Sequence, residues 1–188
     1  MSTFVVGGIE KIEYAPASLT GVILPAAWKP MPNIAVGSVK MTKNIGSKTS
    51  IKQEDGNKTF LNVFQPADGD TLTIGLLEQN PDLVKELFDV DFTAATTTTE
   101  YYAGEKIAHL AIRITTVPMK DSRKCIITIY NNDVQTGYDN NITSDAVEQL
   151  ALTANIGSYR KAGDIKDKVY TKQFVNADGT VIDSTPAG

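Results

Sequence analysis

Residues 71–88, TLTIGLLEQNPDLVKELF, join a strand-like segment to a helix-like one. In residues 71–76, leucine or isoleucine alternates with a small or polar residue, which is the period of a half-buried strand. After Asn80 the apolar residues recur at the spacing of a helix instead. Asn80 is a favourable helix cap, and Pro81 suits the first helical position. The stretch therefore predicts one short α-helix, at about 81–89, packed against a sheet.

The rest of the chain has the pattern of β structure. Residues 58–65 and 71–78 are both strand-like, and the turn residues between them, PADGD, predict a hairpin. Three later segments also alternate, each with one apolar face and one small or polar, almost uncharged face: 106–117, 124–131 and 147–159. Antiparallel sheets with one face in water have this composition. The predicted fold class is therefore mainly β, a sandwich or barrel with one short flanking helix.

The length of 188 residues fits one domain with extended parts. We expect a β domain over residues 1–160, with a long loop at about 26–58 that contains a proline-rich stretch. Residues 161–188 are expected to form a C-terminal extension. This extension is either a hairpin that turns at 176–179 or a polar arm, and the sequence leaves both open.

The composition argues against several classes of protein. With 41% hydrophobic residues the chain can bury a core, and its net charge of −4 disfavours a general nucleic-acid binder. The single Cys125 lies in an apolar run, so a buried and unreactive thiol is expected. No signal sequence is recognised, and no window reaches the roughly 20 apolar residues that span a bilayer. We therefore expect a chain made in a cytoplasm, with no membrane partner.

A catalytic centre is not expected from the sequence. The single histidine, His109, lies within a strand-like segment and lacks the serine and carboxylate of a triad nearby, so a surface or interface role is favoured. No phosphate-binding glycine pattern or calcium-loop spacing occurs. Four aspartates are attributed to turns: Asp68, Asp70, Asp133 and Asp139. The prediction is a protein that is not an enzyme and has no catalytic residue, cofactor or metal ion.

Basic residues gather in two places. Four lysines and no acidic residue occur between Asn33 and Gln53, and a second basic cluster runs from Arg160 to Lys172. A nucleic-acid patch is conceivable, but the first cluster lacks interleaved aromatic residues for base stacking. We favour lysines that protect strand edges or contact acidic neighbours.

Several stretches resemble the major tail protein, or tail tube protein, of long-tailed bacteriophages. The likeness is carried by GGIEKIEYAPAS (7–18), DTLTIGLLEQNPDLVKELFDVDF (70–92), AIRITTVPM (111–119) and QLALTANIGSY (149–159). The combination is a strand, a proline-capped turn, a short helix and a β-rich second half. It covers most of residues 7–160.

This resemblance implies a structural virion protein of the phage tail, assembled in the host cytoplasm. In such proteins a β-sandwich with a flanking helix forms six-fold rings, whose sheets join into one continuous barrel. The rings stack into a tube, which is a conduit for DNA ejection. The implied partners are other copies of the chain, the tail tip, tape-measure and terminator proteins, and DNA that passes through the lumen without specific binding.

The resemblance also suggests positions for the working surfaces. A lumen wall should be polar and neutral or acidic so that DNA slides without sticking. The residues expected to face the lumen are Ala111, Thr115, Gln149, Thr153 and Asn155. The residues expected at interfaces between copies are Trp28, Lys40, Lys43, Lys48, Lys52, Asp82, Glu86, Lys166 and Lys168.

Two alternatives remain open at this stage. The chain could form the tube of a contractile injection system, which has the same fold. It could also be a β-sandwich that binds a ligand or carbohydrate, although an aromatic content of 7% provides little for a sugar-binding platform.

Overall fold

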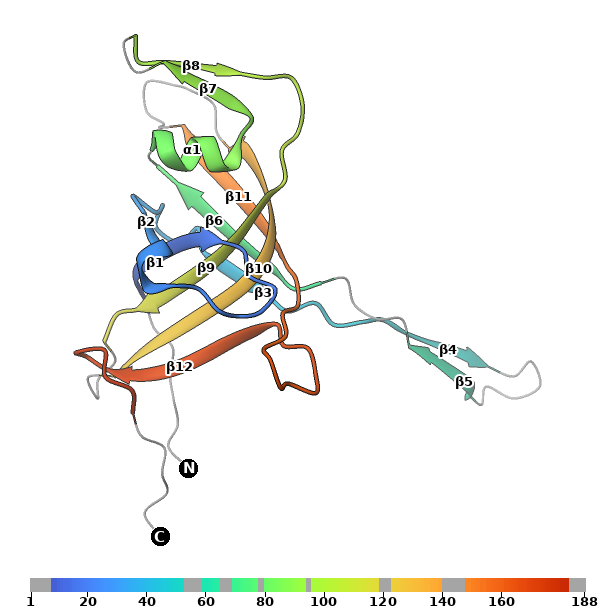
Figure 1. The fold of residues 1–188 in the computed structure, drawn as a ribbon. Helices are drawn as coiled ribbons and strands as arrows, with labels where there is room; N and C mark the ends of the chain where they lie inside the picture. The colour runs from blue at the N-terminus through green and yellow to red at the C-terminus, as the bar shows by residue number, and fades with distance from the viewer. Residues whose placement is uncertain are drawn as a thin grey trace.

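The computed structural model describes residues 8–52, 59–64, 69–77, 80–93, 96–118, 123–139 and 148–182 (Figure 1). The fold is mainly β, with 55% strand and 7% helix, as the sequence predicted. Its elements in chain order are β1 Ile9–Pro16, η1 Pro25–Ala27, β2 Lys29–Met31, β3 Lys40–Thr42, β4 Lys48–Lys52, β5 Thr59–Phe64, β6 Thr71–Leu76, α1 Pro81–Leu87, β7 Val90–Thr93, β8 Thr98–Tyr101, β9 Ala108–Thr116, β10 Arg123–Asp139, β11 Gln149–Ile156 and β12 Tyr170–Asn176.

One large antiparallel sheet forms the body. Its strands follow the order β2-β1-β9-β10-β11-β6-β3, and β12 pairs with the first half of β10. The two ends of this order approach each other through residues 29–42. β2 pairs with β1 at one edge, and shortly afterwards the amide of Ala35 donates to the carbonyl of Gly75 in β6 at 2.8 Å. β3 then pairs with β6 as well. The sheet is therefore curled on itself around a single core.

A bulge in β10 bends the sheet. Ile129 lies opposite Ile112, whereas Asn132 lies opposite Leu110, so β10 carries one extra residue at this point. Inward-facing residues are odd-numbered before the bulge and even-numbered after it, as the burial of Ile129 and Val134 shows. The sequence predicted only 124–131 as a strand here. Because the alternation of buried and exposed residues reverses at the bulge, the sequence pattern did not reveal the second half of β10 as a strand.

The core lies inside the curled sheet and is closed at one end by α1 (Figure 1). Leu83, Val84 and Leu87 of α1 are buried there. The helix begins where the sequence predicted, because the Asn80 side chain accepts a hydrogen bond from the Asp82 amide at 2.9 Å. It ends at Leu87, two residues short of the prediction. Cys125 is buried in the same core, as expected.

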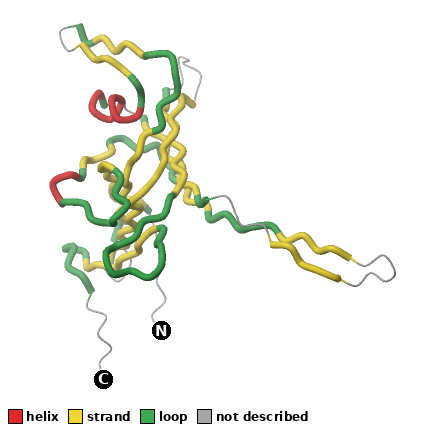
Figure 2. Tube along the Cα trace, turned by 45° about the vertical axis from the view of Figure 1, so that its right-hand side comes forward, coloured by secondary structure: helices red, strands yellow, loops and turns green. Residues whose placement is uncertain are grey.

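Two small hairpins stand outside the body. β4 pairs with β5, and this ribbon projects far to one side (Figure 2). β7 pairs with β8 above the outer side of α1 (Figure 1). The prediction that 58–65 and 71–78 form a hairpin was wrong. β5 pairs with β4, and β6 pairs with β11 and β3 in the main sheet.

The segment after residue 160 does not form a separate arm as far as the structure describes it. β12 is a strand of the main sheet, paired with β10 from Arg123 to Ile129. The chain then turns at Asn176–Gly179, where the Gly179 amide donates to the Asn176 carbonyl at 2.9 Å. The hairpin-like turn predicted at 176–179 is present, but its strand is part of the body.

Candidate assembly surfaces

Four neighbouring strands present one continuous polar surface to the outside. Gln135 of β10 lies beside Thr153 of β11, which lies beside Thr73 of β6, which lies beside Lys40 of β3. We call these outward side chains and their neighbours the polar face. Its residues are Lys40, Thr42, Thr71, Thr73, Asp133, Gln135, Gly137, Gln149, Ala151, Thr153 and Asn155. Nearly all are small or uncharged.

Three of the five predicted lumen residues lie on the polar face: Gln149, Thr153 and Asn155. The other two do not. Ala111 and Thr115 point outward from β9 but are 0% and 6% exposed, so neither offers a surface to a channel. Residues 17–28 cross this part of the sheet, and the Ala17 amide donates to the His109 carbonyl at 3.2 Å. A strand pattern alone cannot show that a loop covers its outer face.

The polar face has an unpaired strand edge on each side among the described residues. β3 pairs with β6 along one edge only. On the other side, β9 ends at Ala108 opposite Val134, so residues 135–139 of β10 pair only with β11. Here a groove of about 440 Å³ separates the polar face from residues 104–107. Open edges of this kind favour pairing with a further strand.

The β4–β5 ribbon carries an exposed apolar side. Ile51 lies opposite Leu61, and their side chains are 46% and 51% exposed. Val63 is on the same side of β5 and is also exposed. A ribbon of two strands is marginally stable alone. Its exposed apolar side is therefore suited to contact another surface.

The predicted interface lysines lie along the path to this ribbon. Lys40 is on the polar face, Lys43 is exposed between β3 and β4, and Lys48 is exposed at the start of β4. Lys52 ends β4, and its side chain is outside the described ones. The structure thus places three of the four at the exposed surface.

The end of the molecule at α1 is acidic. Asp82 and Glu86, both predicted at an interface, lie on the exposed side of the helix. Further exposed carboxylates follow on the β7–β8 side: Asp89, Asp91, Glu100 and Glu105. These carboxylates raise the pKa of neighbouring tyrosine hydroxyls. The pKa of Tyr14 is raised by burial and by the charges of Glu86 and Asp82, and the pKa of Tyr102 is raised by its hydrogen bond to Asp91.

An aromatic cluster lies at the same end. The rings of Phe88 and Tyr138 stack with centroids 5.6 Å apart, and Tyr101 meets both rings edge-on. Burial and a hydrogen bond with Tyr101 raise the pKa of the Tyr138 hydroxyl. These rings come from segments far apart in the sequence, so sequence reasoning had no signal that would bring them together.

Trp28 covers the outer side of the sheet rather than projecting from it. Its ring lies 4.3 Å from the guanidinium carbon of Arg113, whose Nε donates to Glu13 at 2.9 Å. Burial raises the pKa of Glu13, but the hydrogen bonds from Arg113 and Lys11 outweigh it and hold the pKa below 4.5. Trp28 is half-buried in this arrangement. The sequence analysis expected Trp28 at an interface between copies, whereas this contact places its ring against the outer side of the sheet.

The C-terminal basic cluster is partly neutralised by its own acids. Lys168 pairs with Asp164 at 2.8 Å, and Arg160 pairs with Asp167 at 2.6 Å. The hydrogen bond that Lys168 donates to Asp164 raises the pKa of Lys168. Lys166, the other residue predicted at an interface here, is exposed. Two of the five basic side chains between Arg160 and Lys172 are thus paired with acids of the same segment, and the segment keeps a net positive charge.

His109 is exposed on β9, and its Nδ1 lies 2.7 Å from the Asp133 carboxylate of β10. Asp133 was attributed to a turn, but it lies within a strand, as does Asp139. Within the described ranges, no group of three or more His, Cys, Asp or Glu side chains is arranged to hold a metal ion. No helix in the described part of the chain is long and apolar enough to span a membrane.

Comparison of the chain with protein-family models and with curated proteins found no match.

Proposed function

We propose that this protein assembles into stacked six-fold rings that form the tail tube of a bacteriophage, a conduit for DNA ejection. The observation that carries the proposal is the polar face, a four-stranded surface of small, nearly uncharged side chains with an open strand edge on each side. Such a surface can continue from one copy to the next by strand pairing, and the closed ring then has no free edge.

The chemistry of the polar face suits a channel for DNA. Its row of Gln135, Thr153 and Thr73 carries no charge, and Lys40 at the β3 edge is its one cation among the described side chains. DNA is held on proteins mainly by lysine and arginine contacts to phosphate. A wall of hydroxyl and amide groups provides few such contacts, so a polyanion can pass without being retained.

The other surfaces fit contacts between copies. The β4–β5 ribbon projects from the body and is basic at its base, whereas the α1 end is acidic (Figure 1). Two different surfaces on one chain produce head-to-tail contacts, which lead to rings or extended assemblies. In this proposal the protein belongs to the virion, and its further partners are the proteins at the two ends of the tube and the one that sets tail length.

Electron microscopy of the purified protein at increasing concentration tests this function. We expect six-fold rings, and tubes with a hollow centre when rings accumulate. Analytical ultracentrifugation should show mass rising in steps of a ring. A protein that stays monomeric at high concentration, even with a nucleating tail tip, would contradict the proposal. Tubes that bind a contractile sheath would assign the protein to a contractile system instead.

The aromatic cluster supports a second candidate function, binding of a carbohydrate. Tyr101 and Tyr138 are about half exposed beside Phe88, and stacked aromatic rings can pack against sugar rings. Titration of soluble oligosaccharides while following tyrosine fluorescence tests it, with Tyr138→Ala as the variant. Saturable binding that is lost in the variant supports this function, and the absence of binding to a broad glycan panel removes it.

A further inference from the structure

A polar cleft lies between residues 21–28 and the outer side of the main sheet. Its volume is about 340 Å³, and within the described part of the chain no acidic side chain lines it. The polar side chains that line it are Arg113, Thr128, Tyr130 and Gln173. A cleft with one guanidinium and no carboxylate is suited to an anionic ligand.

The register of the strands brings these polar side chains together. Thr128 of β10 lies opposite Arg113 of β9, and Gln173 of β12 lies opposite Ile126 of β10. Ile126 and Tyr130 are each two residues from Thr128, so they share its side of the sheet. The guanidinium, two hydroxyl groups and one amide group therefore line the same cleft.

The segment that covers the cleft is held in place. The Ser18 amide donates to the Tyr130 carbonyl at 2.7 Å. Gly21 has a φ of +66°, and a β-carbon there would lie 2.5 Å from Cδ2 of Tyr159, so glycine is needed for this close approach. Tyr159 in turn packs against Tyr130, with the ring centroids 4.5 Å apart. The cleft is therefore formed before any ligand binds.

Arg113 is fixed in orientation but keeps unused donors. Its Nε donates to Glu13 at 2.9 Å, and its guanidinium carbon lies 4.3 Å from the centre of the Trp28 ring. These two contacts hold the guanidinium plane. The two Nη groups make no hydrogen bond within the described part of the chain. The side chain is 27% exposed, so its remaining donors are accessible to a small ligand.

Positive charge dominates around the cleft. Glu13 accepts hydrogen bonds from both Arg113 and Lys11, so two cations share one carboxylate. Lys161 is a third cation, and its Nζ lies 5.7 Å from the centre of the Tyr130 ring. An excess of one sign of charge in a cleft raises the local concentration of ligands of the opposite sign.

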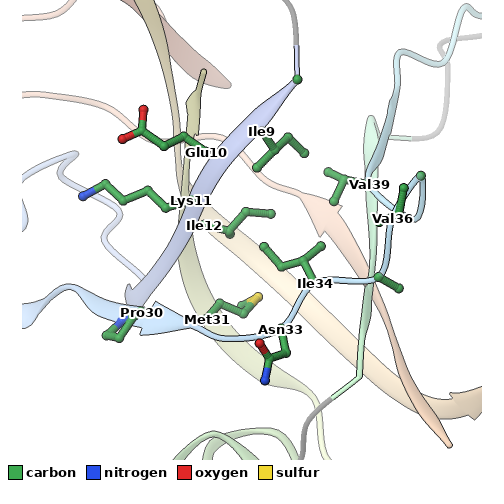
Figure 3. A pocket seen from close by; sticks show the side chains of 13 residues that line it. Ile9, Glu10, Lys11, Ile12, Pro30, Met31, Asn33, Ile34, Val36 and Val39 are labelled. Carbon is green, nitrogen blue, oxygen red and sulfur yellow. The ribbon is translucent and has the colours of Figure 1, made fainter. Parts of the chain in front are cut away.

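Another hollow of the molecule has the opposite character. A groove of about 680 Å³ lies between β1 and residues 33–39, and its lining is mainly apolar (Figure 3). Ile9 and Ile12 point into this groove, whereas Glu10 and Lys11 point away (Figure 3). The groove can hold apolar groups but presents no cation to an anion. Charge therefore directs an anionic ligand to the cleft.

We propose that the cleft beneath residues 21–28 binds the carboxylate group of a small organic acid. The two oxygens of a carboxylate match the planar fork of Arg113 and its two Nη groups. Thr128 and Gln173 line the same space and can donate further hydrogen bonds. The inference goes beyond the tube function, since one chain contains the whole cleft.

The apolar part of the lining favours an organic acid over a bare inorganic anion. Ile23, Trp28 and Ile126 also line the cleft and can contact the body of the acid. Inorganic phosphate would leave these side chains in contact with water. An acid with a compact apolar body binds both kinds of lining at once.

The fluorescence of Trp28 reports on the cleft directly, because it is the only tryptophan in the chain. The purified protein is titrated with cyclohexanecarboxylate and with the neutral cyclohexanecarboxamide, which has the same ring. We expect a saturable change with the acid and a dissociation constant at least about tenfold lower than for the amide, because the guanidinium bonds strengthen with a charged acceptor. Acetate and inorganic phosphate should also bind at least about tenfold more weakly than the acid.

Variants measured by calorimetry identify the groups that hold the acid. Arg113→Gln removes the fork, and Gln173→Glu adds a carboxylate at an exposed position of the cleft. Both should weaken binding of cyclohexanecarboxylate at least about tenfold. Lys40→Gln is the matched control, since it removes one positive charge on the polar face, and it should bind like wild type. Circular dichroism checks each fold, and Gln173→Glu decides alone if Arg113→Gln does not fold.

Four results would overturn the inference: equal affinities for the acid and the amide, binding of phosphate but not of the acid, binding of the acid without a change in Trp28 fluorescence, and no binding of any probe. Wild-type affinity in Gln173→Glu would also overturn it. Assembly is scored separately by electron microscopy. A protein that binds the acid but stays monomeric supports the cleft and contradicts the tube function, and a protein that forms tubes without binding the acid does the reverse.

Discussion

Asn132 shows how one side chain maintains the bend of the sheet. It is fully buried next to the bulge in β10, and its Nδ2 donates to the carbonyl of Leu110 at 2.9 Å. A bulge disrupts the regular ladder and leaves backbone groups that need other partners. The asparagine supplies a donor to one of them inside the core. The curvature that allows the sheet to close around its core therefore depends on a polar residue in an apolar setting.

Replacing Asn132 by alanine should destabilise the protein by about 1–3 kcal/mol, because the Leu110 carbonyl loses a buried donor. Urea unfolding followed by circular dichroism measures the change. Asn155→Ala is the matched control, since Asn155 is exposed on β11, and it should change the free energy of unfolding by less than about 0.5 kcal/mol. Equal midpoints for Asn132→Ala and wild type would contradict this role.

Glu13 makes the stability of the protein depend on pH. Its pKa in the folded state lies below the usual 4.5, since Arg113 and Lys11 stabilise the carboxylate more than burial disfavours it. A lowered pKa adds stability above the unfolded-state pKa, and this stability is lost as the pH falls through the folded-state value. Glu13→Gln should therefore be less stable than wild type at pH 7, by about 1–2 kcal/mol.

Urea unfolding at pH 7 and at pH 3 checks this linkage. The difference between wild type and Glu13→Gln should be smaller at the lower pH, because stability from a lowered pKa is lost progressively once the pH falls below the unfolded-state pKa. A difference that is the same at both values would show that the ion pair with Arg113 does not contribute to the pH dependence.

At the scale of elements, α1 depends on its cap. The helix has seven residues, and three of them close the end of the core. A helix this short is not stable in isolation. Its first turn is fixed by Asn80, whose side chain accepts from the Asp82 amide, and by Pro81.

Asn80→Ala should lower the free energy of unfolding by about 1 kcal/mol, because the Asp82 amide loses its acceptor. Asn80→Ser is the matched control, since serine also caps helices, and should stay within a few tenths of a kcal/mol of wild type. Thermal unfolding compares the three proteins. If both variants lose the same stability, the amide contact is not the cause.

The strands could be predicted from the sequence more readily than their pairing. The alternation in 106–117 and 147–159 reports a buried face and predicts β9 and β11 well. Pairing depends on contacts across the whole chain, so the short turn before β6 suggested a hairpin with β5 that the fold does not contain. A local pattern was also unable to reveal the second half of β10, where the bulge reverses the alternation.

The candidate surfaces, like the strands, could be predicted only where a local pattern reports them. Gln149, Thr153 and Asn155 could be identified because an uncharged polar face is visible in the alternation of one strand. Ala111 and Thr115 have the same pattern but are buried, and residues 17–28 contact their neighbours His109 and Arg113 from almost a hundred residues away. The exposed apolar side of the β4–β5 ribbon combines residues from two separate segments, and only the folded chain brings them together.

At the scale of the whole molecule, the fold has three distinct parts. The curled sheet encloses the core, the polar face extends across four of its strands, and the β4–β5 ribbon projects beyond the body (Figure 2). In the proposed tube, pairing of open strand edges would extend the polar face around a ring. The arrangement supports a protein whose function is performed by many copies and not by one.

Cryo-electron microscopy of the assembled protein, at a resolution that separates strands, tests the central proposal most directly. We expect a hollow tube of stacked six-fold rings whose channel wall is formed by β10, β11, β6 and β3, with Thr153 and Thr73 directed toward the axis. A particle without a channel would contradict the account, and so would a channel lined by the α1 end of the molecule.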